Sequence, residues 1–204
     1  MLENNLLMER SDEEILTLLT TSLDVNYESL VGKYMNQLCS YLEYKGGSTQ
    51  DAQDIVIEVF ERAYLRLKGF SVQQLLELRV RPWLYKIADN LYLNHVTRHS
   101  SIASISLDTL EESSVLAIED ERSEQPERVL ESAESRRELE DLVKALPKTY
   151  RVVVYLHFFA ELSYQEVADV LNVKVGSVRT NVSRGLHVLR QMLETHKHEE
   201  EART

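Results

Sequence analysis

The sequence predicts an all-α protein made of two small helical domains joined by a flexible acidic linker. Only six Gly and three Pro occur in 204 residues, too few turn-forming residues for a many-stranded β-sandwich or barrel. Apolar residues recur at helical spacing along most of the chain. That periodicity stops over residues 100–126, where Ser and acidic residues dominate. The chain therefore divides into two helical blocks.

The composition narrows the class of protein further. The single cysteine, Cys39, excludes a disulfide framework and any metal site built from several cysteines. No apolar run reaches the ~18 residues of a membrane span. The N-terminus is acidic and lacks the basic, apolar and small-residue zones of a signal peptide. We therefore expect a cytoplasmic protein with no membrane partner.

The first block begins after an acidic N-terminal extension, residues 1–10, and covers residues 11–99. Ser11 and Glu14 form a capping box, the pattern that starts a helix. Lys45-Gly46-Gly47-Ser48 ends the second helix, and Pro82 suits the first turn of the last one. The helices expected in this block cover residues 11–24, about 27–44, 50–68, a short stretch within 69–81, and about 82–98.

The second block covers residues 127–193 and is followed by an acidic tail, residues 194–204. The spacing predicts a helix from Glu127 to Ala145, a boundary at Leu146-Pro147, and a helix over Lys148–Phe159.

The clearest local signal is a helix-turn-helix between Leu162 and Gly185. Ser163 and Glu166 form a capping box that starts a helix through Leu171. Asn172-Val173 makes the turn. A second helix, from about Lys174 to Met192, should bury Val178, Val182, Leu186 and Leu189. Its outer face carries groups that read base edges and phosphates in a major groove: Ser177, Arg179, Thr180, Asn181, Ser183 and Arg184.

Residues 79–98 interleave aromatic, basic and amide side chains. This mixture suits single-stranded DNA, which is held by stacking, by cations along the backbone and by hydrogen bonds to unstacked bases. Trp83 also belongs to an apolar stripe and is better explained as a core residue. Asn90 and Asn94 lie one turn apart and off that stripe, so they are the better contact candidates, with Lys86 and Arg98 as neighbouring cations.

The formal net charge of −11 hides a strong segregation of charge. Residues 100–141 carry thirteen acids and four bases, whereas residues 142–193 carry three acids and seven bases. A nucleic-acid footprint is read from local charge rather than from the total. The second block is thus basic enough to bind DNA. The alternative is that the acidic segments only keep the protein soluble, which would give the same net charge of −11.

With these residues in view, the chain resembles the extracytoplasmic-function (ECF, group IV) sigma factors of the bacterial sigma-70 family. DAQDIVIEVFERAYLRL (51–67) and WLYKIADNLYLNHV (83–96) look like sigma region 2. ALPKTYRVVVYLHFFAELSYQEVADVLNVKVGSVRTNVSRGLHVLR (145–190) looks like region 4. The resemblance implies a subunit of RNA polymerase that recognises the minus-35 and minus-10 promoter elements and promotes transcription initiation.

The resemblance also implies a role for individual residues. Asn90 and Asn94 fall where the family contacts the minus-10 element, with Lys86 and Arg98 as the cations beside them. Arg179, Thr180, Asn181 and Arg184 fall on the helix that reads the minus-35 element. Lys148 and Arg151 fall where the DNA backbone is touched. The residues implied to bind polymerase are Asp51, Asp54, Glu58 and Phe60.

The implied partners are promoter DNA and core RNA polymerase, through the clamp helices of its largest catalytic subunit and the flap of the second-largest. An anti-sigma factor is a further candidate partner. We expect no cofactor, no metal site and no enzymatic activity, because the sequence has no glycine-rich phosphate loop and no evident nucleophile–base pair. Two alternatives stay open: a helix-turn-helix regulator that acts without polymerase, and a sigma-like protein-interaction adaptor.

Overall fold

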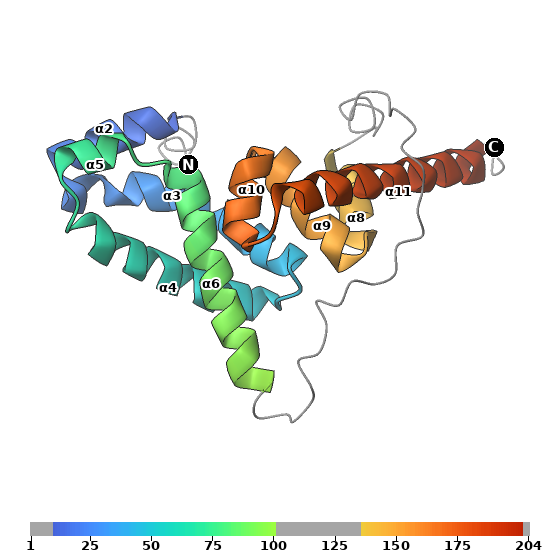
Figure 1. The fold of residues 1–204 in the computed structure, drawn as a ribbon, viewed down its shortest axis with the longest axis horizontal. Coiled ribbons are helices and arrows are strands. Elements are labelled where there is room, and N and C mark those ends of the chain that lie inside the picture. Colours follow the sequence, from blue (N-terminus) through green and yellow to red (C-terminus); the bar gives the residue numbers. More distant parts are fainter. Residues whose placement is uncertain (1–9, 101–135, 202–204) are drawn as a thin grey trace.

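The computed structural model describes residues 10–100 and 136–201, and within them every regular element is helical. In chain order they are α2 (Asp12–Thr21), α3 (Leu23–Tyr44), α4 (Thr49–Leu67), α5 (Val72–Leu76), α6 (Val80–Ser100), α8 (Arg136–Ala145), α9 (Lys148–Val154), the π-helical turn η1 (Tyr155–Phe159), α10 (Tyr164–Leu171) and α11 (Val175–Glu201). Figure 1 shows α2–α6 on one side of the molecule and α8–α11 on the other.

Serine caps start four of these helices. The hydroxyls of Ser11, Ser48, Ser71 and Ser163 each accept a hydrogen bond from the backbone N–H three residues later. Such a bond satisfies one of the donors that a helix N-terminus leaves without an intrahelical partner. The capping boxes predicted at Ser11 and Ser163 are therefore confirmed.

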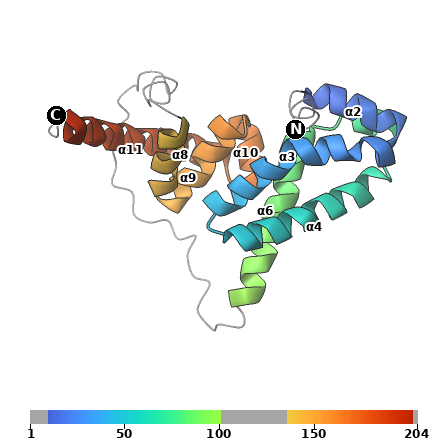
Figure 2. The same ribbon diagram turned by 180° about the vertical axis from the view of Figure 1, so that it is seen from behind.

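Helices α2–α6 enclose one apolar core. The long helix α3 packs along α2 on one side and α4 on the other, and α6 crosses α3 and α4. The core is rich in tyrosine: Tyr34, Tyr41 and Tyr85 are fully buried. Figure 2 shows that α6 extends well beyond the other helices, so its C-terminal half has a large exposed surface.

Helices α8–α11 form a second, smaller unit around α9. Gly185 of α11 lies against this helix, and a Cβ at that position would stand 2.8 Å from Val154 Cγ2 and 3.2 Å from Tyr150 Cβ. Only glycine allows the two backbones to approach this closely. Leu142, Val143 and Leu146 add the apolar contribution of α8 and the turn that follows it.

Several boundaries differ from the sequence prediction, among them the end of the last helix, which runs to Glu201 rather than to about Met192. The second helix begins at Leu23 rather than Tyr27, because only Ser22, in an extended conformation, separates it from α2. The helix predicted over 148–159 widens into a π-helical turn, where the Ala160 N–H bonds to Tyr155 O. Residues 101–135, which hold the predicted linker and the start of the helix predicted from Glu127, lie outside the described residues.

The two helical units lie against each other. α10 packs along the N-terminal half of α6, and α3 contacts α9 and η1. This contact joins elements far apart in the chain, so no local sequence pattern predicts it.

Candidate nucleic-acid interface

The helix-turn-helix forms as predicted. α10 ends at Asn172, whose positive φ of 56° turns the chain toward α11. Asparagine tolerates this left-handed conformation better than most residues. Val178 and Val182 are buried with Leu186 and Leu189, as the spacing predicted. The opposite side of α11 therefore faces solvent.

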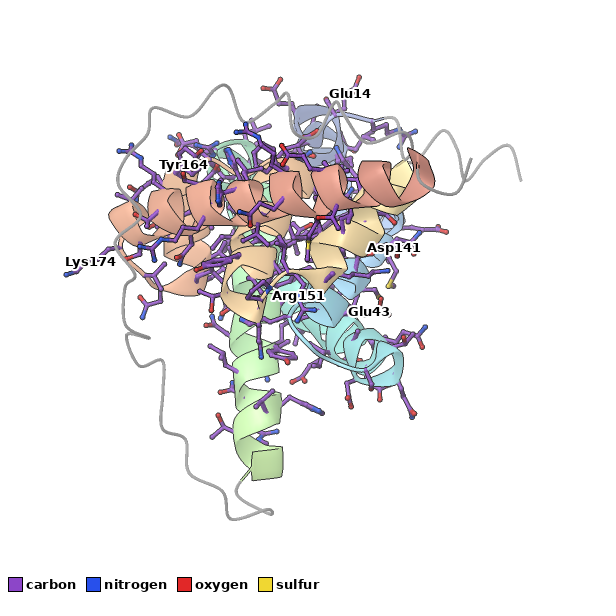
Figure 3. All side chains as sticks on the ribbon, turned by 90° about the vertical axis from the view of Figure 1, so that its right-hand side faces the viewer. Glu14, Glu43, Asp141, Arg151, Tyr164 and Lys174 are labelled. Carbon is purple, nitrogen blue, oxygen red and sulfur yellow. The ribbon has the colours of Figure 1, made fainter. Side chains whose placement is uncertain are left out.

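The predicted base-reading residues lie on that outer side to different extents. Ser177, Arg179, Thr180 and Ser183 are exposed, whereas Asn181 and Arg184 are half-buried. The Arg179 guanidinium lies 5.9 Å from the centre of the Tyr164 ring, which limits its movement. Figure 3 shows Tyr164 and Lys174 on the same side of the view as one end of α11. The Thr180 hydroxyl donates to Gly176 O at 3.0 Å, so its proton is already engaged within the helix.

The outer face of α6 presents a second set of candidates. Asn90, Asn94 and Arg98 are exposed, and between the two asparagines Leu93 is also half exposed. Trp83 is half-buried beside Phe70, with ring centres 6.1 Å apart, so it contributes to packing as predicted.

Lys86 occupies a different environment from its predicted neighbours. Its Nζ donates to Asp169 O at 2.7 Å and to Val170 O at 2.9 Å, at the C-terminus of α10. This cation is held by the second helical unit and does not project into solvent with Asn90.

The inner side of α6 holds a buried ion pair between Asp89 and Lys45 that the sequence did not predict. Asp89, 2% exposed, accepts hydrogen bonds from the Tyr41 hydroxyl and from Lys45 Nζ. Burial lowers the pKa of the Lys45 ammonium, although the nearby Asp89 carboxylate partly opposes this. Burial also raises the pKa of the Tyr41 hydroxyl. Asp89 precedes Asn90 directly, so this pair anchors the inner side of α6 next to its exposed amides.

The acidic row of α4 is partly engaged. Asp54 is exposed, whereas Asp51 accepts from the Ser48 hydroxyl and lies 3.3 Å from His95 Nε2. Glu58 pairs with Arg62 one turn later, at 2.5 Å. Phe60 is only 5% exposed and packs edge-on against Tyr27, so its side chain lies in the core and not beside these carboxylates.

The two cations expected near the DNA backbone are turned toward the protein. Lys148 Nζ lies 5.8 Å from the centre of the Tyr92 ring. Arg151 Nη1 donates to Lys144 O at 2.8 Å. Lys148 is nevertheless exposed, and Arg151 is half-buried with an Nε that has no hydrogen-bond partner among the described residues. The Lys148 interaction also joins the two helical units.

The described residues hold neither a cluster of metal ligands nor a membrane-spanning helix. Within residues 10–100 and 136–201, no three His, Cys, Asp or Glu side chains converge as metal ligands would. No helix in the same part of the chain is long and apolar enough to cross a membrane.

Comparison with known proteins matches both helical units to family models. The model of sigma-70 region 2 matches residues 30–102, and that of sigma-70 region 4 matches residues 136–187. The ECF RNA polymerase sigma factor SigW of Bacillus subtilis is 26% identical over 169 residues, covering 82% of this chain and 88% of its own length. The ECF RNA polymerase sigma-E factor of Escherichia coli is 26% identical over 183 residues, covering 87% and 85%.

Two solved structures share the fold. One is CnrH in complex with the cytosolic domain of CnrY, with a TM-score of 0.54, 17% identity, and coverage of 90% of this chain and 97% of the other. The other is the sigma factor RpoE in complex with the anti-sigma factor NepR from Bartonella quintana, with a TM-score of 0.57, 14% identity, and coverage of 83% and 97%.

The two family models occur in the order region 2 then region 4, and together they span more than half of the chain. These relatives align with more than four-fifths of the chain. The chain therefore belongs to the sigma-70 family, within its extracytoplasmic-function group.

Proposed function

We propose that this chain is an ECF sigma factor: it binds core RNA polymerase, recognises the minus-35 and minus-10 promoter elements and promotes transcription initiation, acting by binding rather than by catalysis. One observation carries the proposal: the chain has three exposed faces of different chemistry. The face on α6 presents amides, the face on α11 presents hydroxyls and a guanidinium, and the face on α4 presents carboxylates. Membership of the family supports all three roles.

The outer face of α11 is proposed to read the minus-35 element as duplex DNA. Arg179 offers a guanidinium fork that matches the acceptors of a guanine edge, and a good bidentate contact is worth ~1–3 kcal/mol of discrimination. The exposed hydroxyls of Ser177 and Ser183, with Thr180, Asn181 and Arg184, complete the set.

The outer face of α6 is proposed to hold the melted minus-10 element. Asn90 and Asn94 each offer an amide donor and acceptor to the edge of an unstacked base. Arg98 supplies a cation for the backbone at the exposed end of the helix. Lys86 joins this face only when it leaves the carbonyls of α10.

The outer side of α4 is proposed to dock on the clamp helices of polymerase. Asp54 is exposed, and Asp51 and Glu58 lie on the same side at helical spacing. Carboxylates in a row suit a basic partner surface and speed its approach. Phe60, buried in this structure, would support that face from below. Region 4 is proposed to contact the flap of the second-largest subunit.

An anti-sigma factor is proposed as a further partner. The solved structure of RpoE is a complex with the anti-sigma factor NepR. A cytoplasmic location follows from the proposed partners, which are promoter DNA and polymerase.

In vitro transcription from a promoter library with purified core polymerase tests the proposal. We expect new, promoter-specific start sites when the chain is added to core enzyme. Duplex binding by the chain with no new transcripts would support a regulator that acts without polymerase. Neither binding nor transcripts would support an adaptor.

A further inference from the structure

Arg179, the exposed guanidinium of the proposed minus-35 face, is held by an aromatic ring. Its Cζ atom lies 5.9 Å from the centre of the Tyr164 ring, in the first turn of α10. Among the residues that the structure describes, no carboxylate forms an ion pair with Arg179 and no acceptor takes a hydrogen bond from its side chain. The ring therefore restrains the guanidinium while its N–H donors stay available.

A carboxylate partner would restrain the same side chain at the expense of its donors. Carboxylates accept hydrogen bonds from the guanidinium fork, which is the edge that also pairs with the O6 and N7 acceptors of guanine. An aromatic face instead attracts the cation through its quadrupole and leaves that edge open. A tyrosine ring is thus suited to hold an arginine that has still to bind a base.

Tyr164 is itself packed against a second ring. The His157 imidazole of η1 stacks on it, with ring centres 4.3 Å apart and an angle of 24° between the planes. The Phe158 ring meets His157 edge-on, with ring centres 4.7 Å apart. His157, Tyr164 and Arg179, the arginine stack, form a series of contacts that runs from η1 through α10 to the outer face of α11.

The arginine stack is anchored to the backbone where η1 joins α10. His157 Nδ1 lies 2.7 Å from Leu162 O, and because a carbonyl oxygen only accepts, Nδ1 carries the hydrogen and donates it. Leu162 N in turn donates to Leu156 O at 3.0 Å. Tyr164 follows Ser163, whose capping box fixes the start of α10. Both the imidazole and the backbone that carries the tyrosine are therefore held in place.

Restraint of an arginine improves its discrimination between base pairs. Ordering a long side chain costs conformational entropy, and a side chain that is already ordered avoids this cost when it binds. A restrained guanidinium meets acceptors in one place, whereas a mobile one also reaches phosphates and neighbouring bases. Loss of the restraint should therefore reduce the preference for one base pair more than the affinity for DNA in general.

We propose that Tyr164 and His157 are positioning residues for minus-35 recognition: the two stacked rings hold the Arg179 guanidinium where it reads one base pair. The inference rests on the proposed function and adds to the minus-35 face two residues that lie outside α11. Neither residue has to touch a base, because both act through Arg179.

Nitrogen-15 relaxation of the Arg179 Nε–Hε group in the free full-length chain measures the restraint directly. We expect its order parameter to be lower in Tyr164→Leu and in His157→Leu than in wild type, because each change removes a ring of the arginine stack. Tyr164→Phe keeps the ring and should match wild type. An order parameter for Tyr164→Leu equal to that of wild type would overturn the proposal.

His187→Leu is the matched control for His157→Leu. His187 is exposed on α11 and its Nε2 lies 3.2 Å from Gln191 Nε2, outside the arginine stack. Its loss should leave the Arg179 order parameter at the wild-type value. Circular dichroism checks the helical content of each variant, and if Tyr164→Leu loses helix, His157→Leu decides the same question with α10 unaltered.

Selection from promoters with a randomised minus-35 element measures the consequence for the holoenzyme made with core polymerase. Arg179→Ala identifies the base pair that Arg179 reads, since the preference at that pair is lost. Tyr164→Leu should reduce the same preference about two- to five-fold, the factor that corresponds to an exposed cation–π contact, whereas Tyr164→Phe should retain it. In the Arg179→Ala background, Tyr164→Leu should have no further effect at that pair.

The pattern of loss separates positioning from a purely structural role. A Tyr164→Leu holoenzyme that loses affinity for all minus-35 sequences equally would overturn the proposal, and so would a further loss of preference in the Arg179→Ala background. A wild-type holoenzyme without any minus-35 preference contradicts the proposed function instead, and leaves the relaxation result standing.

Discussion

Asp89 and Asn90 are neighbours in the chain with opposite surroundings. Asp89 is buried against Lys45 and Tyr41, whereas Asn90 is exposed on the other side of α6. A charge inside a core is tolerated only when it is paired and hydrogen-bonded. The buried pair therefore fixes the rotation of α6, and with it the direction in which the proposed base contacts point.

Breaking this pair should destabilise the protein. Lys45→Met leaves the Asp89 carboxylate buried with only the Tyr41 hydroxyl as its partner, and we expect a loss of ~3–5 kcal/mol in the free energy of unfolding. Lys45→Met with Asp89→Asn removes both charges and should recover more than half of that loss. Urea unfolding followed by circular dichroism gives both values. A single variant within 0.5 kcal/mol (about the error of additivity) of wild type would contradict the assignment.

Single residues also mark the limit of the sequence prediction. Asn90 and Asn94 could be assigned to an exposed face because they lie one helical turn apart and outside the apolar stripe of the helix. Asp89 could not be assigned to the core, because its partner Lys45 lies at the C-terminal cap of α3, 44 residues earlier. The same limit applies to Lys86, whose backbone acceptors lie on α10, and to Lys148, which the family resemblance placed near the DNA backbone and which lies beside the Tyr92 ring of α6.

At the scale of single helices, α11 contains a pair of glycines with opposite surroundings. A Cβ at Gly185 would meet Val154 and Tyr150, whereas nothing lies within 4 Å of a Cβ at Gly176. Gly185→Ala should therefore lower the free energy of unfolding by ~1–3 kcal/mol through overpacking. Gly176→Ala should raise it by up to ~1 kcal/mol, since alanine is the better helix former. Thermal unfolding of the two variants compares them, and equal shifts would show that α9 and α11 do not approach as described.

Helix α4 carries the proposed polymerase contact. Asp54→Lys with Glu58→Lys reverses the charge of its outer side and should weaken binding to core polymerase at least ten-fold, as expected for loss of about two charge-assisted contacts. The helical content should not change, because both side chains are solvent-accessible. Glu28→Lys with Glu77→Lys, at exposed positions on α3 and after α5, is the matched control. Competition with wild type for core enzyme measures the effect, and wild-type competition by the α4 variant would refute the docking assignment.

Most helices could be predicted because their signals are local. Serine caps, apolar spacing and the Asn172 turn each depend on a few neighbouring residues, and each is present in the structure. The π-helical turn at Tyr155–Phe159 could not be predicted in this way. Its aromatic side chains contact Tyr41 and Tyr44 of α3, and such contacts between distant residues leave no local pattern.

At the scale of the whole molecule, the charged residues also join the two helical units. The sequence indicated a basic second block that would face DNA, but the part of it that faces α6 is acidic. Arg79 pairs with Glu166 on that side, and Arg81 pairs with Glu161. Charge thus serves the packing of the two helical units as well as the proposed contact with nucleic acid.

The central claim is that one chain reads two elements of one promoter with two different faces. Permanganate footprinting of open complexes, together with duplex-binding affinity measured on the same variants, tests it most directly. Asn90→Ala with Asn94→Ala should reduce permanganate reactivity at the minus-10 element about ten-fold, with little change in upstream duplex binding. Arg179→Ala with Arg184→Ala should weaken upstream duplex binding by a similar factor. Melting of the minus-10 element should persist in the complexes that still form. Equal loss of both signals in both double variants would contradict the division of labour between α6 and α11.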